Sequence, residues 1–184
     1  MSVLLTASLS ATLPLSAASH VDVVKMRTEN RVNPLGIGTS TPRFSWQITS
    51  DRKGVVQTSY QILVASSKEK LDRNEADLWD SGERNSDEQL WIPYQGKVLL
   101  SGAQAYWKVR ITTNKGKSEW TEPQLFTIGL LGETKWSGTW IGLEDLQPGE
   151  QKGMHTRLAA RYIRKDFATK GKVKRAVAYV AGLG

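Results

Sequence analysis

The chain has 184 residues, of which 39% are hydrophobic and 23% charged, and its formal net charge is +7. This composition is that of a globular protein, and the length allows one domain and part of another. The absence of cysteine excludes a disulfide scaffold, a zinc–thiolate site and a cysteine nucleophile. Two histidines, His20 and His155, are too few for a three-histidine metal site, and no apolar run is long enough to predict a membrane span.

The positive charge is concentrated in residues 151–184, which carry nine basic side chains and one acidic side chain. The other 150 residues carry 16 basic and 17 acidic groups, so their net charge is −1. Nucleic-acid binding would require stacking aromatic rings on the same surface, and Tyr162, Phe167 and Tyr179 are expected to be buried in a β domain. We therefore interpret the charges as solvent-facing side chains of strands and expect no nucleic-acid partner.

Residues 1–19 carry no charge and are rich in Leu, Ala and Ser. Small residues at Ser16 and Ala18 suit signal-peptidase cleavage after Ala18, although the usual basic segment is absent. The alternatives are an export signal and a disordered tail. We expect an export signal, which predicts a periplasmic or extracellular protein, and we exclude this segment from the fold.

Residues 20–130 show seven short segments with strand patterns. Three of them alternate clearly between apolar and polar positions, at 42–48, 60–65 and 105–113. The side chains predicted to face the core are Phe44, Trp46, Ile62, Val64, Trp107, Val109 and Ile111. The other four segments are 23–27, 78–82, 90–94 and 120–128, with Pro93 indicating an edge strand.

Seven strands at hairpin-like spacing are typical of an all-β, immunoglobulin-like or fibronectin type III-like antiparallel β-sandwich. The segment 66–76 is predicted to be a polar loop with one helical turn, too polar to join the core. Residues 131–184 have a different character, with a polar loop at 144–155 and two expected strands at 161–169 and 173–180. Since two strands cannot bury a core, we expect 131–184 to be the truncated start of a second, jelly-roll-type β domain.

Motifs in the first 130 residues resemble the N-terminal region of bacterial α-L-rhamnosidases of glycoside hydrolase family 78. The motifs that carry the resemblance are Glu29-Asn30, Asn33-Pro34-Leu35-Gly36-Ile37, Pro42-Arg43-Phe44-Ser45-Trp46, Gln57-Thr58-Ser59-Tyr60-Gln61-Ile62, Trp79-Asp80-Ser81-Gly82, Leu100-Ser101-Gly102, Tyr106-Trp107-Lys108-Val109-Arg110, Gly116-Lys117-Ser118-Glu119-Trp120 and Phe126-Thr127-Ile128-Gly129-Leu130. A weaker match continues through Trp136, Trp140-Ile141, residues 160–167, Lys174-Arg175-Ala176, Tyr179 and Gly182-Leu183-Gly184. Together these motifs are specific, whereas each alone is weak.

The resemblance implies a fibronectin type III-like module, then a jelly-roll β domain, with a catalytic (α/α)₆ barrel much later in the chain. It implies inverting hydrolysis of terminal α-L-rhamnosyl linkages, with the remaining domains and rhamnose-containing glycans as partners. The barrel residues have no counterpart here, so we expect a non-catalytic N-terminal fragment that is inactive alone. Family members place a tyrosine where Ala105 stands, which leaves the tyrosine-corner hydrogen bond without its usual donor because Tyr106 lies on the opposite face.

The sequence offers no catalytic, cofactor-binding or metal-ligating residue that we would assign. Glu144 and Asp145 are adjacent, whereas glycosidase carboxylates face each other across a sugar, and His155 has no second ligand nearby. Phosphate-binding loops, nucleophile elbows and metal-ligand spacings are missing from the sequence.

The seven tryptophans have different expected roles. Trp46 and Trp107 are expected in the core, and Trp120 is expected to stack on the cations of the strand that carries Lys108 and Arg110. Three others are expected to contact a neighbouring domain or, alternatively, a ligand: Trp91, Trp136 and Trp140. The alternative function is therefore a free-standing carbohydrate-binding or adhesion sandwich.

Overall fold

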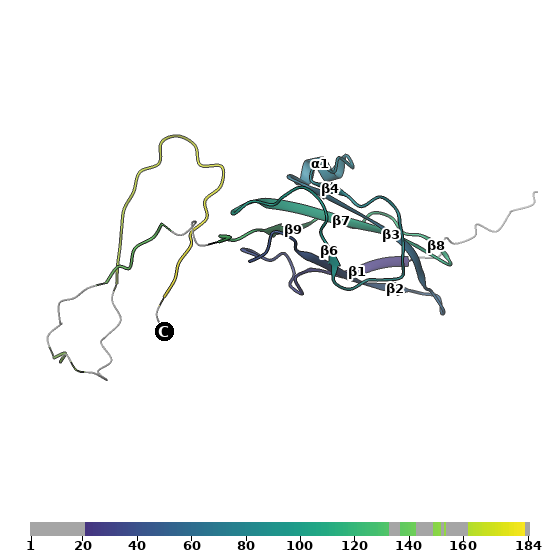
Figure 1. The fold of residues 1–184 in the computed structure, drawn as a ribbon, viewed down its shortest axis with the longest axis horizontal. Coiled ribbons are helices and arrows are strands. Elements are labelled where there is room, and N and C mark those ends of the chain that lie inside the picture. The colour runs from purple at the N-terminus through teal and green to yellow at the C-terminus, as the bar shows by residue number, and fades with distance from the viewer. Residues whose placement is uncertain (1–20, 133–136, 143–148, 152, 154–161, 183–184) are drawn as a thin grey trace, which may run out of the picture. The chain divides into compact units, whose positions relative to one another are not determined.

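The computed structural model describes residues 21–132, 137–142, 149–151, 153 and 162–182 (Figure 1). The chain divides into two units, one up to Ser137 and the other from Gly138. All helices and strands of the described residues lie in the first unit. The export signal predicted for 1–19 lies outside the described residues.

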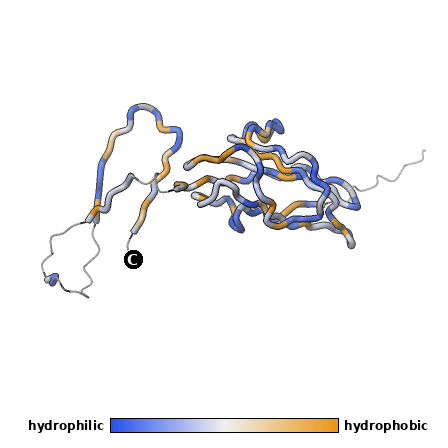
Figure 2. The backbone as a smooth tube through the Cα atoms, in the orientation of Figure 1, coloured by the Kyte–Doolittle hydropathy of each residue, from blue (hydrophilic) through white to orange (hydrophobic). Residues whose placement is uncertain are grey.

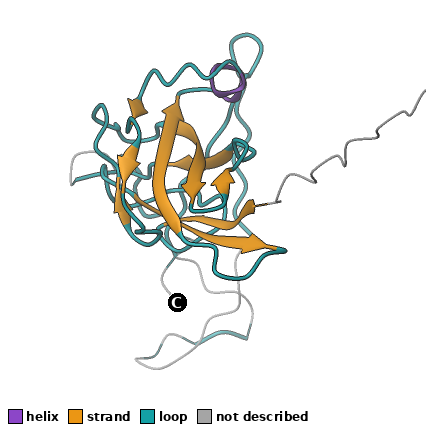
Figure 3. Ribbon diagram, turned by 90° about the vertical axis from the view of Figure 1, so that its right-hand side faces the viewer, coloured by secondary structure: helices purple, strands orange, loops and turns teal. Residues whose placement is uncertain are grey.

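The first unit is an antiparallel β structure of two sheets (Figures 1 and 3). Its elements are β1 (Val21–Thr28), β2 (Arg43–Ser50), β3 (Gln57–Ala65), α1 (Lys68–Asp72), β4 (Trp79–Asp80), β5 (Arg84–Asn85), β6 (Ile92–Pro93), β7 (Gln104–Thr113), β8 (Gly116–Lys117) and β9 (Gln124–Thr127). One sheet has the order β1-β2-β6, and the other has the order β4-β3-β7-β8, with β5 paired to β3 and β9 paired to β7. The all-β prediction is confirmed, and β6 is an edge strand, as Pro93 indicated. The two-residue strands β5 and β8 were not predicted as strands, because two residues are too few to show an alternating pattern.

The core lies between the two sheets, where the predicted inward-facing side chains meet. All seven of them are at most 1% exposed, from Phe44 and Trp46 on β2 to Trp107 on β7. The rings of Phe44 and Trp107 have centroids 4.4 Å apart. Figure 2 shows hydrophobic residues recurring along the strands between hydrophilic ones. This period of two positions each strand's apolar face against the other sheet.

A second, smaller core lies on the outer face of β3 and β7, beneath α1. Leu63, Ala65 and Leu71 form it, and Leu71 is fully buried. One helical turn was predicted correctly, but the expectation that this segment stays out of the core was wrong. The reason lies in tertiary packing, because a single leucine in the polar turn, Leu71, packs against the outward-facing side chains of β3.

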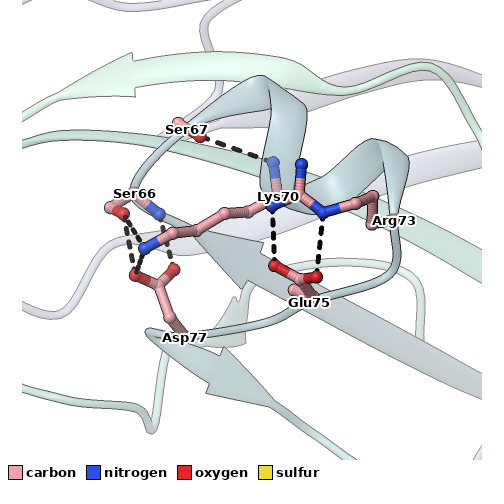
Figure 4. A network of polar contacts seen from close by, with 6 residues as sticks. All are labelled: Ser66, Ser67, Lys70, Arg73, Glu75 and Asp77. Atoms are coloured by element: carbon pink, nitrogen blue, oxygen red, sulfur yellow. Dashed lines mark hydrogen bonds and ion pairs between the residues drawn. The ribbon is translucent and has the colours of Figure 1, made fainter.

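Polar contacts fix the turn that holds α1 (Figure 4). Ser67 caps the helix by accepting a hydrogen bond from the backbone N–H of Lys70. The Asp77 carboxylate accepts hydrogen bonds from the backbone N–H and the hydroxyl of Ser66, at 2.8 and 2.7 Å, and from the ammonium of Lys70. Burial by itself would raise the pKa of Asp77, but these hydrogen bonds outweigh it and lower that pKa to about 2.

Residues 162–182 form no strand, which contradicts the two strands expected at 161–169 and 173–180 as far as those segments are described. Tyr162, Phe167 and Tyr179, which we expected to be buried, are 105%, 84% and 41% exposed. A strand needs a partner for its backbone N–H and C=O groups. Among the described residues, no strand pairs with this segment.

Candidate functional site

The backbone after β9 leaves the sandwich between two loops. On one side, the N–H of Thr127 donates to the carbonyl of Pro34 at 3.0 Å, and the N–H of Ile37 donates to the carbonyl of Thr127 at 2.8 Å. The N–H of Gly129 then donates to the carbonyl of Ile37 at 2.8 Å. Residues 34–37 therefore pair with the exit segment in the manner of a short strand.

The loop before β7 holds the exit segment from the other side. The N–H of Ile128 donates to the carbonyl of Ala103 at 2.8 Å, and the N–H of Gly102 donates to the carbonyl of Ile128 at 3.1 Å. The N–H of Leu131 donates to the hydroxyl of Ser101 at 2.9 Å. We name residues 34–37, 100–103 and 127–131 the exit clamp.

Two glycines allow the backbones of the exit clamp to approach closely. A Cβ atom added to Gly129 would lie 3.0 Å from the carbonyl oxygen of Gly36, closer than side chains normally come. Gly36 has a φ of +72°, which other residues rarely adopt. Exposed apolar side chains stand on the two loops of the clamp, with Leu35 74% and Leu100 70% exposed.

A row of three side chains lies at the surface near the start of β2. The guanidinium of Arg43 donates two hydrogen bonds to the carboxylate of Glu29, at 3.1 and 2.8 Å, and the backbone N–H of Arg43 donates a third at 2.8 Å. On its other side, the Cζ of Arg43 lies 4.2 Å from the ring centroid of Trp91. The hydrogen bonds from Arg43 lower the pKa of Glu29. We name Glu29, Arg43 and Trp91 the Trp91 row.

A shallow pocket of about 460 Å³ adjoins the Trp91 row at Glu29. Its lining residues are Glu29, Arg31, Pro34, Leu35, Gly36, Ile37, Gly38 and Thr39. The pocket thus combines charged and hydroxyl side chains with the backbone of a glycine-containing loop. The sequence pattern does not reveal this pocket, because its residues come together only when the segment 29–39 folds back beside β2.

The expected stack on Trp120 is present. Lys108 Nζ and Arg110 Cζ lie 5.1 and 4.4 Å from the Trp120 ring centroid. The Lys108 residue is only 5% exposed, and its ammonium donates to the carbonyl of Leu71 and to Asn74 Oδ1. This cluster attaches α1 to the sheet, so its role is structural.

Two described carboxyl groups have shifts opposite to the one that a glycosidase acid needs. A general acid needs a carboxyl group with a raised pKa. Hydrogen bonds instead lower the pKa of Glu29 and of Glu83, whose main partners are Arg43 and Ser59 respectively. Glu144, Asp145, His155 and Trp136 lie outside the described residues.

The described residues show neither a metal-binding cluster nor a membrane-spanning helix. They contain no group of three or more His, Cys, Asp or Glu side chains that could hold a metal ion. They also contain no helix of the length and hydropathy that a membrane span requires.

Residues 23–132 match the family model described as the Rha78A-like, N-terminal immunoglobulin domain. An α-L-rhamnosidase of Formosa agariphila is 34% identical over 181 residues, covering 90% of this chain and 19% of its own length. An α-L-rhamnosidase of Streptomyces avermitilis is 39% identical over 124 residues, covering 67% of this chain and 12% of its own length.

Solved structures agree with these relatives. A Streptomyces avermitilis α-L-rhamnosidase complexed with L-rhamnose superimposes with a TM-score of 0.63 at 36% identity, covering 67% of this chain and 12% of that one. A Dictyoglumus thermophilum α-L-rhamnosidase gives 0.62 at 36% identity, covering 65% and 14%. This chain therefore spans under a fifth of the length of these relatives, and it belongs to the family of N-terminal immunoglobulin-like domains of α-L-rhamnosidases.

Proposed function

We propose that the chain is the N-terminal, non-catalytic module of a longer α-L-rhamnosidase that removes terminal α-L-rhamnose from glycans. The observation that carries the proposal is the family match over residues 23–132 in a chain spanning 12–19% of these curated relatives. The proposal includes an export signal at 1–19, a sandwich at 20–130, the start of a second β domain at 131–184, and a periplasmic or extracellular location.

The module's proposed role is to hold the start of the following polypeptide in a fixed position. The exit clamp supports this role because hydrogen bonds on both sides of residues 127–131 leave that backbone little freedom. The exposed Leu35 and Leu100 side chains supply apolar surface for the remaining domains of the hydrolase. Such packing would stabilise the complete enzyme without contributing a reacting group.

Activity assays test the proposal directly. The purified 184-residue chain, incubated with 4-nitrophenyl α-L-rhamnopyranoside, should release nitrophenol only at the uncatalysed rate. A longer gene product that contains this chain should hydrolyse the same substrate. Turnover by the chain itself that survives repurification, and is abolished by replacing an acid within residues 21–150, would place the reaction in the sandwich and contradict the proposal.

The alternative is a free-standing carbohydrate-binding or adhesion module. It requires a reading frame that stops after Gly184, whereas the module of a hydrolase requires a frame that continues with further β strands and a long helical region. Reading the DNA beyond this codon distinguishes the two. Both are compatible with a glycan contact on the sandwich surface.

A further inference from the structure

Two apolar side chains, Leu90 and Trp91, stand exposed in the segment just before β6. Leu90 is 64% exposed and Trp91 is 46% exposed. Trp91 also has a φ of +60°, a backbone conformation that bulky residues rarely adopt. Core packing does not account for strain at a residue whose ring is exposed, so the strain points to a function for the position of the ring.

Hydrogen bonds hold this segment against β2. The N–H of Trp46 donates to the carbonyl of Gln89 at 3.0 Å. The N–H of Trp91 donates to the hydroxyl of Ser45 at 2.9 Å. Earlier in the same loop, the buried amide group of Gln57 donates to two backbone carbonyls, at 3.0 and 2.9 Å. The two exposed side chains are therefore carried by a loop that is already ordered.

Arg43 adds an ordered cation to the same surface. Its guanidinium lies over the Trp91 ring, with Cζ 4.2 Å from the ring centroid, and donates two hydrogen bonds to the Glu29 carboxylate. The Arg43 side chain is nevertheless 48% exposed. Because Glu29 already holds the guanidinium, a partner that contacts Arg43 loses little side-chain freedom. Glu29 uses Nε and Nη2, so the Nη1 donors can serve an acceptor on a partner.

We propose that Leu90, Trp91 and Arg43 form a docking surface for a domain of the same hydrolase that is encoded beyond Gly184. Tryptophan and arginine are the residues that most often dominate the binding energy of protein interfaces. The partner surface is an apolar depression that receives the Trp91 ring and Leu90, with oxygen acceptors that face Arg43. Interfaces between domains of one chain are more polar than obligate ones, so the Glu29–Arg43 ion pair suits the rim.

The lengths of the relatives favour a partner within the same polypeptide. The chain covers 19% and 12% of two curated relatives, so more than four fifths of such a hydrolase lies outside the matched part. A domain tethered to the sandwich has a high effective concentration, so a small surface with a few good contacts is enough to dock it. The inference rests on the proposed function, because it requires a longer hydrolase, and it adds a contact surface that the exit clamp does not include.

Hydroxyl-radical footprinting of the isolated 184-residue chain and of the longer gene product that contains it tests the proposal. The oxidation rate of Trp91 should fall about fivefold or more in the longer protein, because a dominant interface side chain is almost fully desolvated. The internal control is Trp120, which stacks on the cations of β7, and its rate should change less than about twofold. Equal oxidation of Trp91 in the two proteins, or equal protection of Trp120, overturns the proposal.

Variants separate docking from a role inside the sandwich. Glycine suits a φ of +60°, so isolated Trp91→Gly should fold and melt close to the wild-type chain. In the longer hydrolase, Trp91→Gly should increase the rate at which trypsin releases the sandwich about tenfold or more, and Leu90→Ala should increase it less strongly. The control is Val56→Ala, which truncates a 53% exposed side chain just beyond the other end of β2. It should change that rate less than about twofold.

The outcomes distinguish this proposal from the proposed function. An active hydrolase in which Trp91 is oxidised as fast as in the isolated chain contradicts the docking surface alone. A longer product without rhamnoside hydrolysis contradicts the proposed function alone, and the footprint then decides the docking surface. A reading frame that stops after Gly184 contradicts both.

Two further outcomes would assign Trp91 another role. If Trp91→Gly destabilises the isolated chain as much as the longer protein, the ring supports the sandwich itself. If sedimentation shows dimers of the isolated chain that Trp91→Gly abolishes, the partner is a second copy. Either result overturns the proposal.

Discussion

Trp46 and Gln57 form a hydrogen-bonded pair inside the sandwich, with the indole N–H donating to Gln57 Oε1 at 3.0 Å. The amide group of Gln57, only 2% exposed as a residue, donates in turn to the carbonyls of Ser86 and Glu88, at 3.0 and 2.9 Å. One buried glutamine therefore joins β2 and β3 to the loop that leads to Trp91. Its polar atoms are satisfied, which is the condition for tolerating a polar group in a core.

Replacing Gln57 with leucine should destabilise the sandwich strongly. Leucine has a similar volume, but it leaves the Trp46 indole N–H and two carbonyls without their partner. We expect the free energy of unfolding to fall by about 2–4 kcal/mol. Urea unfolding followed by tryptophan fluorescence measures the loss. The matched control is Gln61→Leu on the same strand, whose bonds to Asp80 and Arg110 are nearer the surface, and an equal loss there would contradict the prediction.

The Asp77 carboxylate should contribute a pH-dependent part of the stability. Its folded-state pKa of about 2 lies below the ordinary value of 3.8. The unfolded chain therefore binds more protons between these values, so stability rises with pH in that window. The contribution is complete above about pH 5 and is lost as the pH falls through about 2.

The variant Asp77→Asn should lower the free energy of unfolding by about 1 kcal/mol at neutral pH, after allowing for solvent screening. The difference from wild type should shrink as the pH approaches 2. Urea unfolding at several pH values measures it. Glu75→Gln, which removes the exposed pair with Arg73, should change the stability much less than Asp77→Asn does, because solvent screens an exposed ion pair. A pH-independent loss in Asp77→Asn would mean that the carboxylate charge is not responsible.

Gly129 should tolerate no side chain. A Cβ atom there meets the carbonyl of Gly36 at 3.0 Å, so Gly129→Ala must push apart two hydrogen-bonded segments of the exit clamp. We expect a loss of about 1–3 kcal/mol and faster hydrogen exchange at residues 127–131. Gly38→Ala is the control, because nothing lies within 4 Å of its Cβ position. Equal thermal stability of the two variants would show that the clamp accommodates the methyl group.

Lys108→Met should loosen α1 while leaving the sandwich folded. Methionine keeps most of the aliphatic stem but cannot donate to the Leu71 carbonyl or to Asn74. Since burial lowers the pKa of Lys108, the ammonium carries a desolvation cost that these bonds offset. We expect a net loss of about 1–2 kcal/mol and faster exchange of α1 amides. Lys68→Met, which breaks only the exposed pair with Asp72, is the control, and a more stable Lys108→Met would refute this account.

The inward faces of the strands could be predicted because their signal is local. Phe44 and Trp46, or Trp107 and Val109, stand two residues apart, and a strand turns every second side chain to the same face. The single helical turn that follows Ser67 could also be predicted, because a helix cap and one helical turn depend on residues that are neighbours in the sequence. The alternation of side chains along each strand also showed which tryptophans face the core. The core positions of Trp46 and Trp107 and the stacking of cations on Trp120 were therefore predicted correctly.

The sequence by itself therefore determined the fold class, the family and the inner faces of the sandwich, since alternation and turn chemistry act within a few residues. Only the tertiary structure decided which distant groups meet: Gln57 with Trp46, Lys108 with Leu71, Gly129 with Gly36 and Glu29 with Arg43. It also overturned two local predictions, the exclusion of 66–76 from the core and the strands in 162–182. In both cases the outcome depends on a partner element. The outer face of β3 and β7 provides one for Leu71, whereas no described strand pairs with residues 162–182.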